Sequence, residues 1–153
     1  MTKLTVLATC AALMAIAAFA QDTPGSHFVE NWDMDRNGAV SLEEIIERRE
    51  IVFNMFDNDQ NGALDAVEYV IFDETRAADM ENNAGGQGNG GDRMQEGLTL
   101  GFNDTNADGN VSKDEFVSNS AAWVAQIDRN GDGMITSDDF GPQSNYTPAP
   151  ELT

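Results

Sequence analysis

Apolar side chains recur at helical spacing in two segments of the chain, residues 45–56 and 116–127. In the first segment the apolar positions fall on one broad face of a helix and the polar positions on the other. The apolar positions are Ile45, Ile46, Val52, Phe53 and Phe56, and the polar positions are Glu47, Arg48, Glu50 and Asn54. The second segment repeats the pattern with Phe116, Val117, Trp123, Val124 and Ile127. Each segment predicts one amphipathic helix whose apolar stripe lies in the core, with a docking groove as the alternative.

A polar segment of twelve residues precedes each of these helices, and another follows it. We name the segments loop 1 (33–44), loop 2 (57–68), loop 3 (104–115) and loop 4 (128–139). Each loop alternates oxygen-bearing side chains around a central glycine, which predicts a sharp turn, and carries an apolar residue two positions later. The glycines are Gly38, Gly62, Gly109 and Gly133, and the apolar residues are Val40, Leu64, Val111 and Ile135.

A bound divalent cation explains the alternation, because calcium takes six to eight oxygens at about 2.3–2.6 Å from a single short loop. In loop 1 the candidate ligands are Asp33, Asp35, Asn37, the Ala39 carbonyl, Ser41 and Glu44. In loop 2 they are Asp57, Asp59, Asn61, the Ala63 carbonyl, Asp65 and Glu68. In loop 3 they are Asp104, Asn106, Asp108, the Asn110 carbonyl, Ser112 and Glu115. In loop 4 they are Asp128, Asn130, Asp132, the Met134 carbonyl, Thr136 and Asp139. An Asx-rich surface turn without an ion is the alternative for any one loop, and the repetition favours metal.

Two loops differ from the others in their acids. Asp65 gives loop 2 an additional carboxylate, so we expect the strongest attraction for calcium there. Loop 4 ends in Asp139 instead of Glu. A side chain one methylene shorter predicts a weaker or magnesium-tolerant site, which Asp139→Glu would tighten.

The four loops, with apolar residues on both sides, resemble the calcium-binding loops of the EF-hand superfamily over residues 28–140. The resemblance implies an all-α fold, a helix-loop-helix array in which short β-bridges join paired loops. The apolar residues two positions after each glycine would form those bridges. It also implies an exported, calmodulin-like or calsymin-like protein that binds up to four Ca²⁺ ions.

The spacing of the loops predicts which of them pair. Loops 1 and 2 begin twenty-four residues apart, as do loops 3 and 4, whereas forty-seven residues separate Asp57 from Asp104. Residues 45–56 suffice for one shared helix of about 18 Å, and loops at opposite ends of one helix cannot meet. We therefore expect loop 2 to pair with loop 3 and loop 1 with loop 4.

The last residues of each loop also predict the start of the helix that follows. Ser41 and Glu44 stand three apart, as in a capping box, and the other loops repeat the spacing with Asp65 and Glu68, Ser112 and Glu115, and Thr136 and Asp139. Loss of metal should therefore loosen these helix starts. The helix before loop 3 is the least regular, because Asn103 stands where Phe56 and Ile127 stand before loops 2 and 4.

The start of the chain predicts export. Lys3, an apolar stretch over residues 4–19 and the small residues Ala18 and Ala20 fit a signal peptide over 1–20, with a membrane anchor or lipidation at Cys10 as alternatives. The product would be periplasmic or secreted, without stable membrane insertion after removal of the leader. The remaining chain divides into a four-loop domain over 21–140 and a polar, proline-containing tail over 141–153. Within the domain, a glycine-rich linker over 82–91 joins unit one (26–81) to unit two (92–140).

Charge and composition limit the partners and the chemistry. A formal net charge of −19 argues against nucleic acid and favours calcium ions and a protein partner with a basic or apolar surface. We expect no enzyme, because Cys10 would leave with the leader, His27 is the single histidine, and the clustered carboxylates are explained as ligands.

Two roles remain open within calcium binding. An exported calcium buffer or calcium-stabilised module is favoured, because extracellular modules work at about 0.1–1 mM calcium. The alternative is a sensor that exposes an apolar surface to regulate a protein partner.

Overall fold

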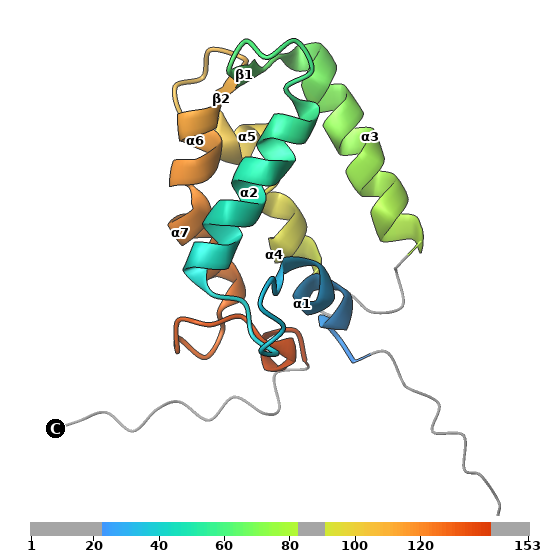
Figure 1. The fold of residues 1–153 in the computed structure, drawn as a ribbon, viewed down its shortest axis with the longest axis vertical. Helices are drawn as coiled ribbons and strands as arrows, with labels where there is room; N and C mark the ends of the chain where they lie inside the picture. The colour runs from blue at the N-terminus through green and yellow to red at the C-terminus, as the bar shows by residue number, and fades with distance from the viewer. Residues whose placement is uncertain (1–22, 83–90, 142–153) are drawn as a thin grey trace, which may run out of the picture.

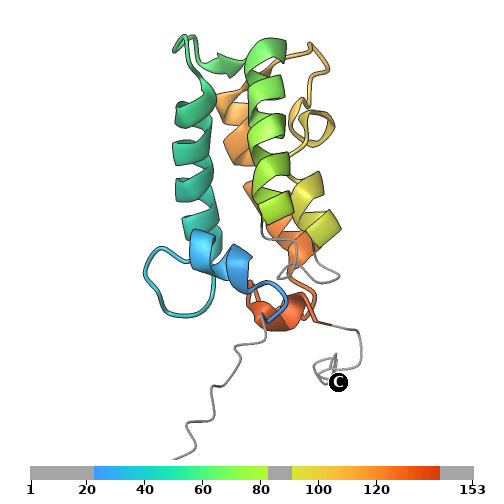
Figure 2. The same ribbon diagram turned by 90° about the vertical axis from the view of Figure 1, so that its right-hand side faces the viewer.

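The computed structural model describes residues 23–82 and 91–141, and within them the fold is the all-α array expected from the sequence. Figures 1 and 2 show a bundle of helices with α2 and α3 running along its length and loops at both ends. The helices are α1 (Ser26–Trp32), α2 (Leu42–Phe56), α3 (Ala66–Asn82), α4 (Gly91–Glu96), α5 (Leu100–Asn103), α6 (Lys113–Ser118) and α7 (Ser120–Ile127). A 3₁₀ turn, η3 (Ser137–Asp139), and two short strands, β1 (Ala63–Leu64) and β2 (Val111–Ser112), complete the elements. The predicted leader (1–20), most of the linker and nearly all of the tail lie outside the described residues.

Helix α2 is the helix predicted to be shared between loops 1 and 2. It begins at a capping box in which Ser41 accepts from the Glu44 backbone N–H and the Glu44 side chain accepts from the Ser41 N–H. It ends at Asp57, whose N–H donates to the Phe53 carbonyl. Loop 1 therefore lies at one end of α2 and loop 2 at the other, as Figure 1 shows.

The corresponding helix between loops 3 and 4 is not continuous, so the prediction of one helix over 116–127 is wrong. Helix α6 ends and α7 begins on either side of Asn119, whose backbone (φ −76°, ψ 0°) stays in the right-handed region but has a ψ well above the α-helical value of about −42°. Ser120 Oγ donates to the Val117 carbonyl at 2.6 Å, and Asn119 Nδ2 donates to the Phe102 carbonyl at 3.0 Å. The Ser120 hydroxyl thus competes for a carbonyl of the helical ladder, and Asn119 ties the break to α5.

The loops pair as predicted. Strands β1 and β2 are antiparallel, with Ala63 opposite Ser112 and Leu64 opposite Val111, so loop 2 lies against loop 3. Loop 1 meets loop 4 through a single bridge between Val40 and Ile135. The side chains of the four central apolar residues are completely buried, and each pair closes one end of the core.

The core is one apolar cluster between the paired loops. Phe53 and Phe116 pack at its centre, with ring centroids 6.0 Å apart, and Trp123 lies fully buried beside them. Ile45 and Ile127 are also buried, whereas Val52 and Phe56 pack against the cluster partly exposed. The apolar stripes predicted for the two helices therefore lie largely in the core, whereas Ile46 and Val117 stay partly exposed outside the buried cluster.

Candidate metal centres

One hydrogen bond recurs at the turn of every loop. The N–H of the central glycine donates to the carboxylate of the first loop residue: Gly38 to Asp33 at 2.8 Å, Gly62 to Asp57 at 3.1 Å, Gly109 to Asp104 at 3.0 Å and Gly133 to Asp128 at 2.8 Å. All four glycines have φ between 85° and 91°, a left-handed conformation in which a side chain is strained. The bond folds each loop around the carboxylate of its first candidate ligand.

A second recurring hydrogen bond draws the last residue of the loop back to its beginning. The N–H of the second loop residue donates to the closing carboxylate: Met34 to Glu44 at 2.8 Å, Asn58 to Glu68 at 2.7 Å, Thr105 to Glu115 at 3.2 Å and Arg129 to Asp139 at 2.9 Å. The first and last candidate ligands of each loop thus face the same space.

Side chains in the middle of the loops are held by the same kind of contact. In loops 1 and 2 the amide of the fifth residue donates to the acid at the third, from Asn37 to Asp35 at 3.0 Å and from Asn61 to Asp59 at 2.8 Å. Loops 3 and 4 exchange the two residue types: Asn106 donates to Asp108 at 2.9 Å, and Asn130 to Asp132 at 2.8 Å. The side chains of the third and fifth residues are therefore in contact in all four loops.

The structure brings the acids of the first two loops together most closely. Ligand oxygens of Asp33, Asp35 and Glu44 all lie within 4.8 Å of one another, as do those of Asp57, Asp59 and Glu68. Hard carboxylate oxygens without nitrogen or sulfur donors suit calcium or magnesium better than a softer transition metal. Both groups could hold such an ion.

The predicted capping pairs place the ninth and twelfth loop residues against each other. Ser112 Oγ donates to Glu115 at 2.8 Å, and the Ser112 N–H donates to the same carboxylate oxygen at 2.9 Å. Donation from the backbone and hydroxyl of Ser112, with further bonds from Thr105 and Asn106, lowers the pKa of Glu115 to about 2. Asp65 and Glu68 repeat the reciprocal pairing, with the Glu68 N–H donating to Asp65 at 3.0 Å.

Loop 4 compensates for its shorter closing residue through the backbone. Asp139 lies in the 3₁₀ turn η3 and is 1% exposed. Its carboxylate accepts from the Arg129 and Thr136 N–H groups at 2.9 and 2.8 Å, the positions that the longer glutamates satisfy elsewhere. Because the 3₁₀ turn brings the shorter side chain to these two donors, we expect a smaller effect of Asp139→Glu than side-chain length alone predicts. The prediction that this substitution tightens the site stays a prediction.

Several residues that shape the site escaped the sequence analysis. The fourth residue of every loop is left-handed, at Arg36, Gln60, Ala107 and Gly131. Arg49 is fully buried on the apolar face of α2, and Asn103 is fully buried just before loop 3. The signal for Arg49 was its place in the series 45, 49, 53, which is the spacing of the core face.

Comparison with protein families agrees with the loop geometry. A family model described as EF hand matches residues 103–118, which contain loop 3 and the following helix α6, and residues 122–141, which contain most of α7 and loop 4. A search of curated proteins found no match. The family matches and the acidic groups together support an EF-hand calcium-binding family and calcium binding by this chain.

Proposed function

We propose that this protein binds calcium through all four loops and acts as an exported calcium buffer or a module that calcium stabilises. The observation that carries the proposal is the pair of hydrogen bonds common to all four loops, which sets the first and last carboxylates around one space. The ligands in each loop are those named from the sequence. An EF hand is typically a non-enzymatic calcium-binding domain.

Calcium would stabilise the fold by relieving repulsion within the loops. The chain carries a formal net charge of −19, and two acidic groups each bring three carboxylates within 4.8 Å. A bound divalent ion offsets that repulsion, and it fixes the capping residues that begin α2, α3 and α6. Calcium binding and helix formation therefore draw on the same oxygens.

Calorimetric titration of the full chain with calcium, in about 1 mM magnesium, tests the proposal. We expect four binding events. Glu44→Gln, Glu68→Gln and Glu115→Gln should each weaken one event by about 10- to 100-fold, because each removes a charged closing ligand. Glu43→Gln is the matched control, since it removes an equal charge from an exposed neighbour of Glu44. Unchanged stoichiometry and affinity in all three closing variants would contradict the ligand assignment.

Export is the second part of the proposal and rests on the sequence of residues 1–20. Expression in a bacterial host, followed by fractionation and sequencing of the mature N-terminus, tests it. We expect a product in the periplasm or medium that begins at Gln21. An uncleaved product retained in the cytosol would contradict export and leave calcium binding unaffected.

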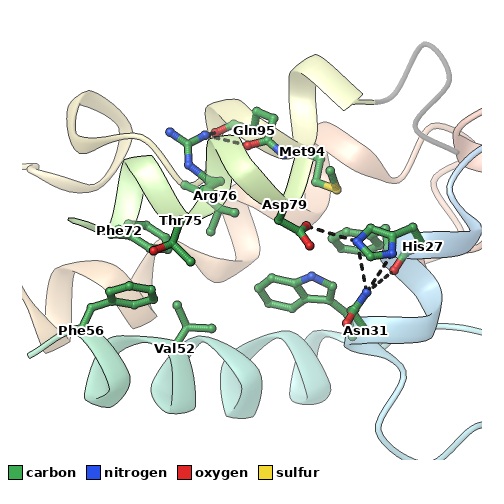
Figure 3. A pocket seen from close by; sticks show the side chains of 13 residues that line it. His27, Asn31, Val52, Phe56, Phe72, Thr75, Arg76, Asp79, Met94 and Gln95 are labelled. Carbon is green, nitrogen blue, oxygen red and sulfur yellow. Dashed lines mark hydrogen bonds and ion pairs between the residues drawn. The ribbon is translucent and has the colours of Figure 1, made fainter. Parts of the chain in front are cut away.

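A sensor is the second candidate function, because the bundle holds an open apolar cavity of about 250 Å³ between α1, α2, α3 and α4. Figure 3 shows Phe56 and Phe72 at one end, with His27 and Asp79 facing each other at the other end, 3.2 Å apart. A dye that reports exposed apolar surface, followed during the calcium titration, separates the two roles. A rise in signal as the loops fill would favour the sensor, and a fall would favour the buffer or calcium-stabilised module.

A further inference from the structure

A buried arginine lies at the centre of the bundle, bonded only to neutral acceptors among the residues that the structure describes. The guanidinium of Arg49 donates to the Phe116 carbonyl at 2.8 Å, the Gly97 carbonyl at 3.1 Å and Asn103 Oδ1 at 2.5 Å. It also lies over the Phe116 ring, 4.1 Å from its centroid. Burial lowers the pKa of Arg49 to about 10, which leaves the group charged at neutral pH.

Asn103 extends this contact into a network. Its two amide hydrogens are shared among three acceptors, the Thr99 carbonyl at 2.8 Å, the Gly97 carbonyl at 3.1 Å and the Tyr69 hydroxyl at 3.3 Å. The Tyr69 hydroxyl in turn donates to the Leu98 carbonyl at 2.9 Å. Burial raises the pKa of Tyr69 to about 12, so the phenol keeps the proton that it donates.

The network joins two loops through residues adjacent to their candidate ligands. Tyr69 directly follows Glu68, the last ligand of loop 2, and Asn103 directly precedes Asp104, the first ligand of loop 3. Arg49 holds Asn103 from the middle of α2 while also holding the carbonyl of Phe116, which directly follows Glu115. A movement of loop 2 or loop 3 would therefore strain the hydrogen bonds that position the residue beside a candidate ligand of the other loop.

Stability alone does not explain a charged residue here. Replacing buried ionic groups by apolar residues of similar volume is often neutral or stabilising, so stability is a weak reason for the charge. A planar guanidinium has a different advantage, because it fixes the directions of several hydrogen-bond acceptors at once. The residue directly before the loop is apolar at loops 1, 2 and 4, where it is Trp32, Phe56 and Ile127, and the polar Asn103 occurs at loop 3. The polar network thus belongs to one of the two loop pairs.

We propose that Arg49 is a positioning residue that couples calcium binding in loop 2 to calcium binding in loop 3 through Asn103 and Tyr69. The inference rests on the proposed function, and it assigns to Arg49 an effect beyond the direct contact of β1 with β2. Coupling between binding sites is typically 5- to 150-fold in affinity.

Site-resolved calcium titration of the full chain by NMR tests the coupling. The amide signals of Gly62 and Gly109 report loops 2 and 3, and Glu68→Gln disables loop 2. The coupling factor is the affinity of loop 3 with loop 2 intact, divided by its affinity with loop 2 disabled. We expect a factor of at least about five in the natural chain, and a factor at least threefold smaller with Arg49→Met. Arg48→Met removes the same charge from the preceding residue of α2, and it should leave the coupling factor unchanged.

A double variant separates coupling from stability. Arg49→Met with Asn103→Leu removes both polar partners, which should restore the unfolding midpoint in chelator if Arg49→Met alone lowers it. We expect the double variant to fold and remain uncoupled. Arg49→Lys keeps the charge without the planar fork and should also lower the factor.

The outcomes distinguish this inference from the proposed function. A coupling factor that Arg49→Met, Arg49→Lys and the double variant all leave within twofold of the natural value would overturn the role of Arg49. Absence of calcium binding in the natural chain would instead overturn the proposed function. A uniform loss of affinity at all loops cancels in the coupling factor and counts against the inference.

Discussion

The two ends of the bundle hold similar loop pairs in different ways. At one end, loops 2 and 3 share the β1–β2 ladder, and the helices behind them are tied by the polar network of Arg49, Asn103 and Tyr69. At the other end, a single Val40–Ile135 bridge joins loops 1 and 4. Aromatic pairs lie behind both ends: here Trp32 meets Trp123 with centroids 4.9 Å apart and Phe28 meets Phe140 at 5.5 Å, and behind loop 2 Phe56 meets Phe72 at 4.9 Å. The polar network of Arg49 is the addition at the loop 2 and loop 3 end. Among the described residues, loop geometry is thus common to both ends while the support behind the loops is not.

The difference separates two physical requirements. Aromatic packing is tolerant of small displacements, because dispersion is non-directional, whereas a hydrogen-bonded network fixes directions. We therefore expect the loop 2 and loop 3 end to respond to calcium as a unit, and the loop 1 and loop 4 end to fill more independently. Five variants break or sharpen this contrast, in order of expected effect.

Gly97→Ala should destabilise both ends together. A Cβ at Gly97 would overlap the indole ring of the fully buried Trp123, and the Gly97 carbonyl also accepts from Arg49 and Asn103. We expect a loss of about 3 kcal/mol in the free energy of unfolding, measured by urea denaturation in chelator. Gly101→Ala is the control, since nothing lies within 4 Å of its Cβ position and α5 should gain slightly. Equal effects from the two substitutions would show that Gly97 is not a packing constraint.

Glu115→Gln should make the stability of the fold less sensitive to acid, through the loop 2 and loop 3 end. The folded pKa of Glu115 is about 2, below its ordinary value of 4.5. Because the pKa is lowered, its contribution to stability is present above about pH 4.5 and is lost as the pH falls towards 2. In chelator, the variant should be less stable than the natural chain at pH 7, and it should lose less stability than the natural chain between pH 4.5 and 2.

Asp114→Asn provides the comparison for that experiment, because it removes an exposed carboxylate one position before Glu115. Circular dichroism during acid titration gives both curves. If the two variants have superimposable acid limbs, the hydrogen bonds from Ser112 do not control the titration of loop 3.

Gly131→Ala and Ala107→Gly should act in opposite directions on loops 4 and 3. Both positions are left-handed, with φ of 74° at Gly131 and 58° at Ala107. Left-handed backbone costs a residue with a Cβ about 1 kcal/mol, so Gly131→Ala should lower stability and Ala107→Gly should raise it by up to that amount. Thermal unfolding in chelator measures both. Shifts of the same sign would show that backbone strain does not determine the change in stability at these two positions.

Asp139→Glu should change the calcium affinity of loop 4 by less than about threefold, the smallest effect of the series. The carboxylate of Asp139 already meets the Arg129 and Thr136 N–H groups, and its buried position leaves little room for another methylene. The amide signal of Gly133 during a calcium titration reports this site. A tenfold gain would show that side-chain length limits loop 4 after all.

Much of this architecture was predictable because it is local. Each loop carries its own turn glycine, capping pair and inward apolar residue, so the sequence alone located the loops and the start of α2. Loop pairing followed from chain length, since a shared helix keeps loops 1 and 2 apart. The candidate ligands likewise came from spacing, and they remain predictions until calcium binding is measured.

The tertiary structure decided what depends on neighbours distant in the chain. Arg49 has no local sign of burial beyond its spacing, because its acceptors come from residues 48, 54 and 67 positions away. The break at Asn119 likewise uses the Phe102 carbonyl, and the tighter turn at Asp139 belongs to a backbone that closes against Arg129. Periodicity in the sequence determines which face of a helix is apolar. Which polar group may enter that face is decided only when the fold brings enough hydrogen-bonding partners to satisfy it.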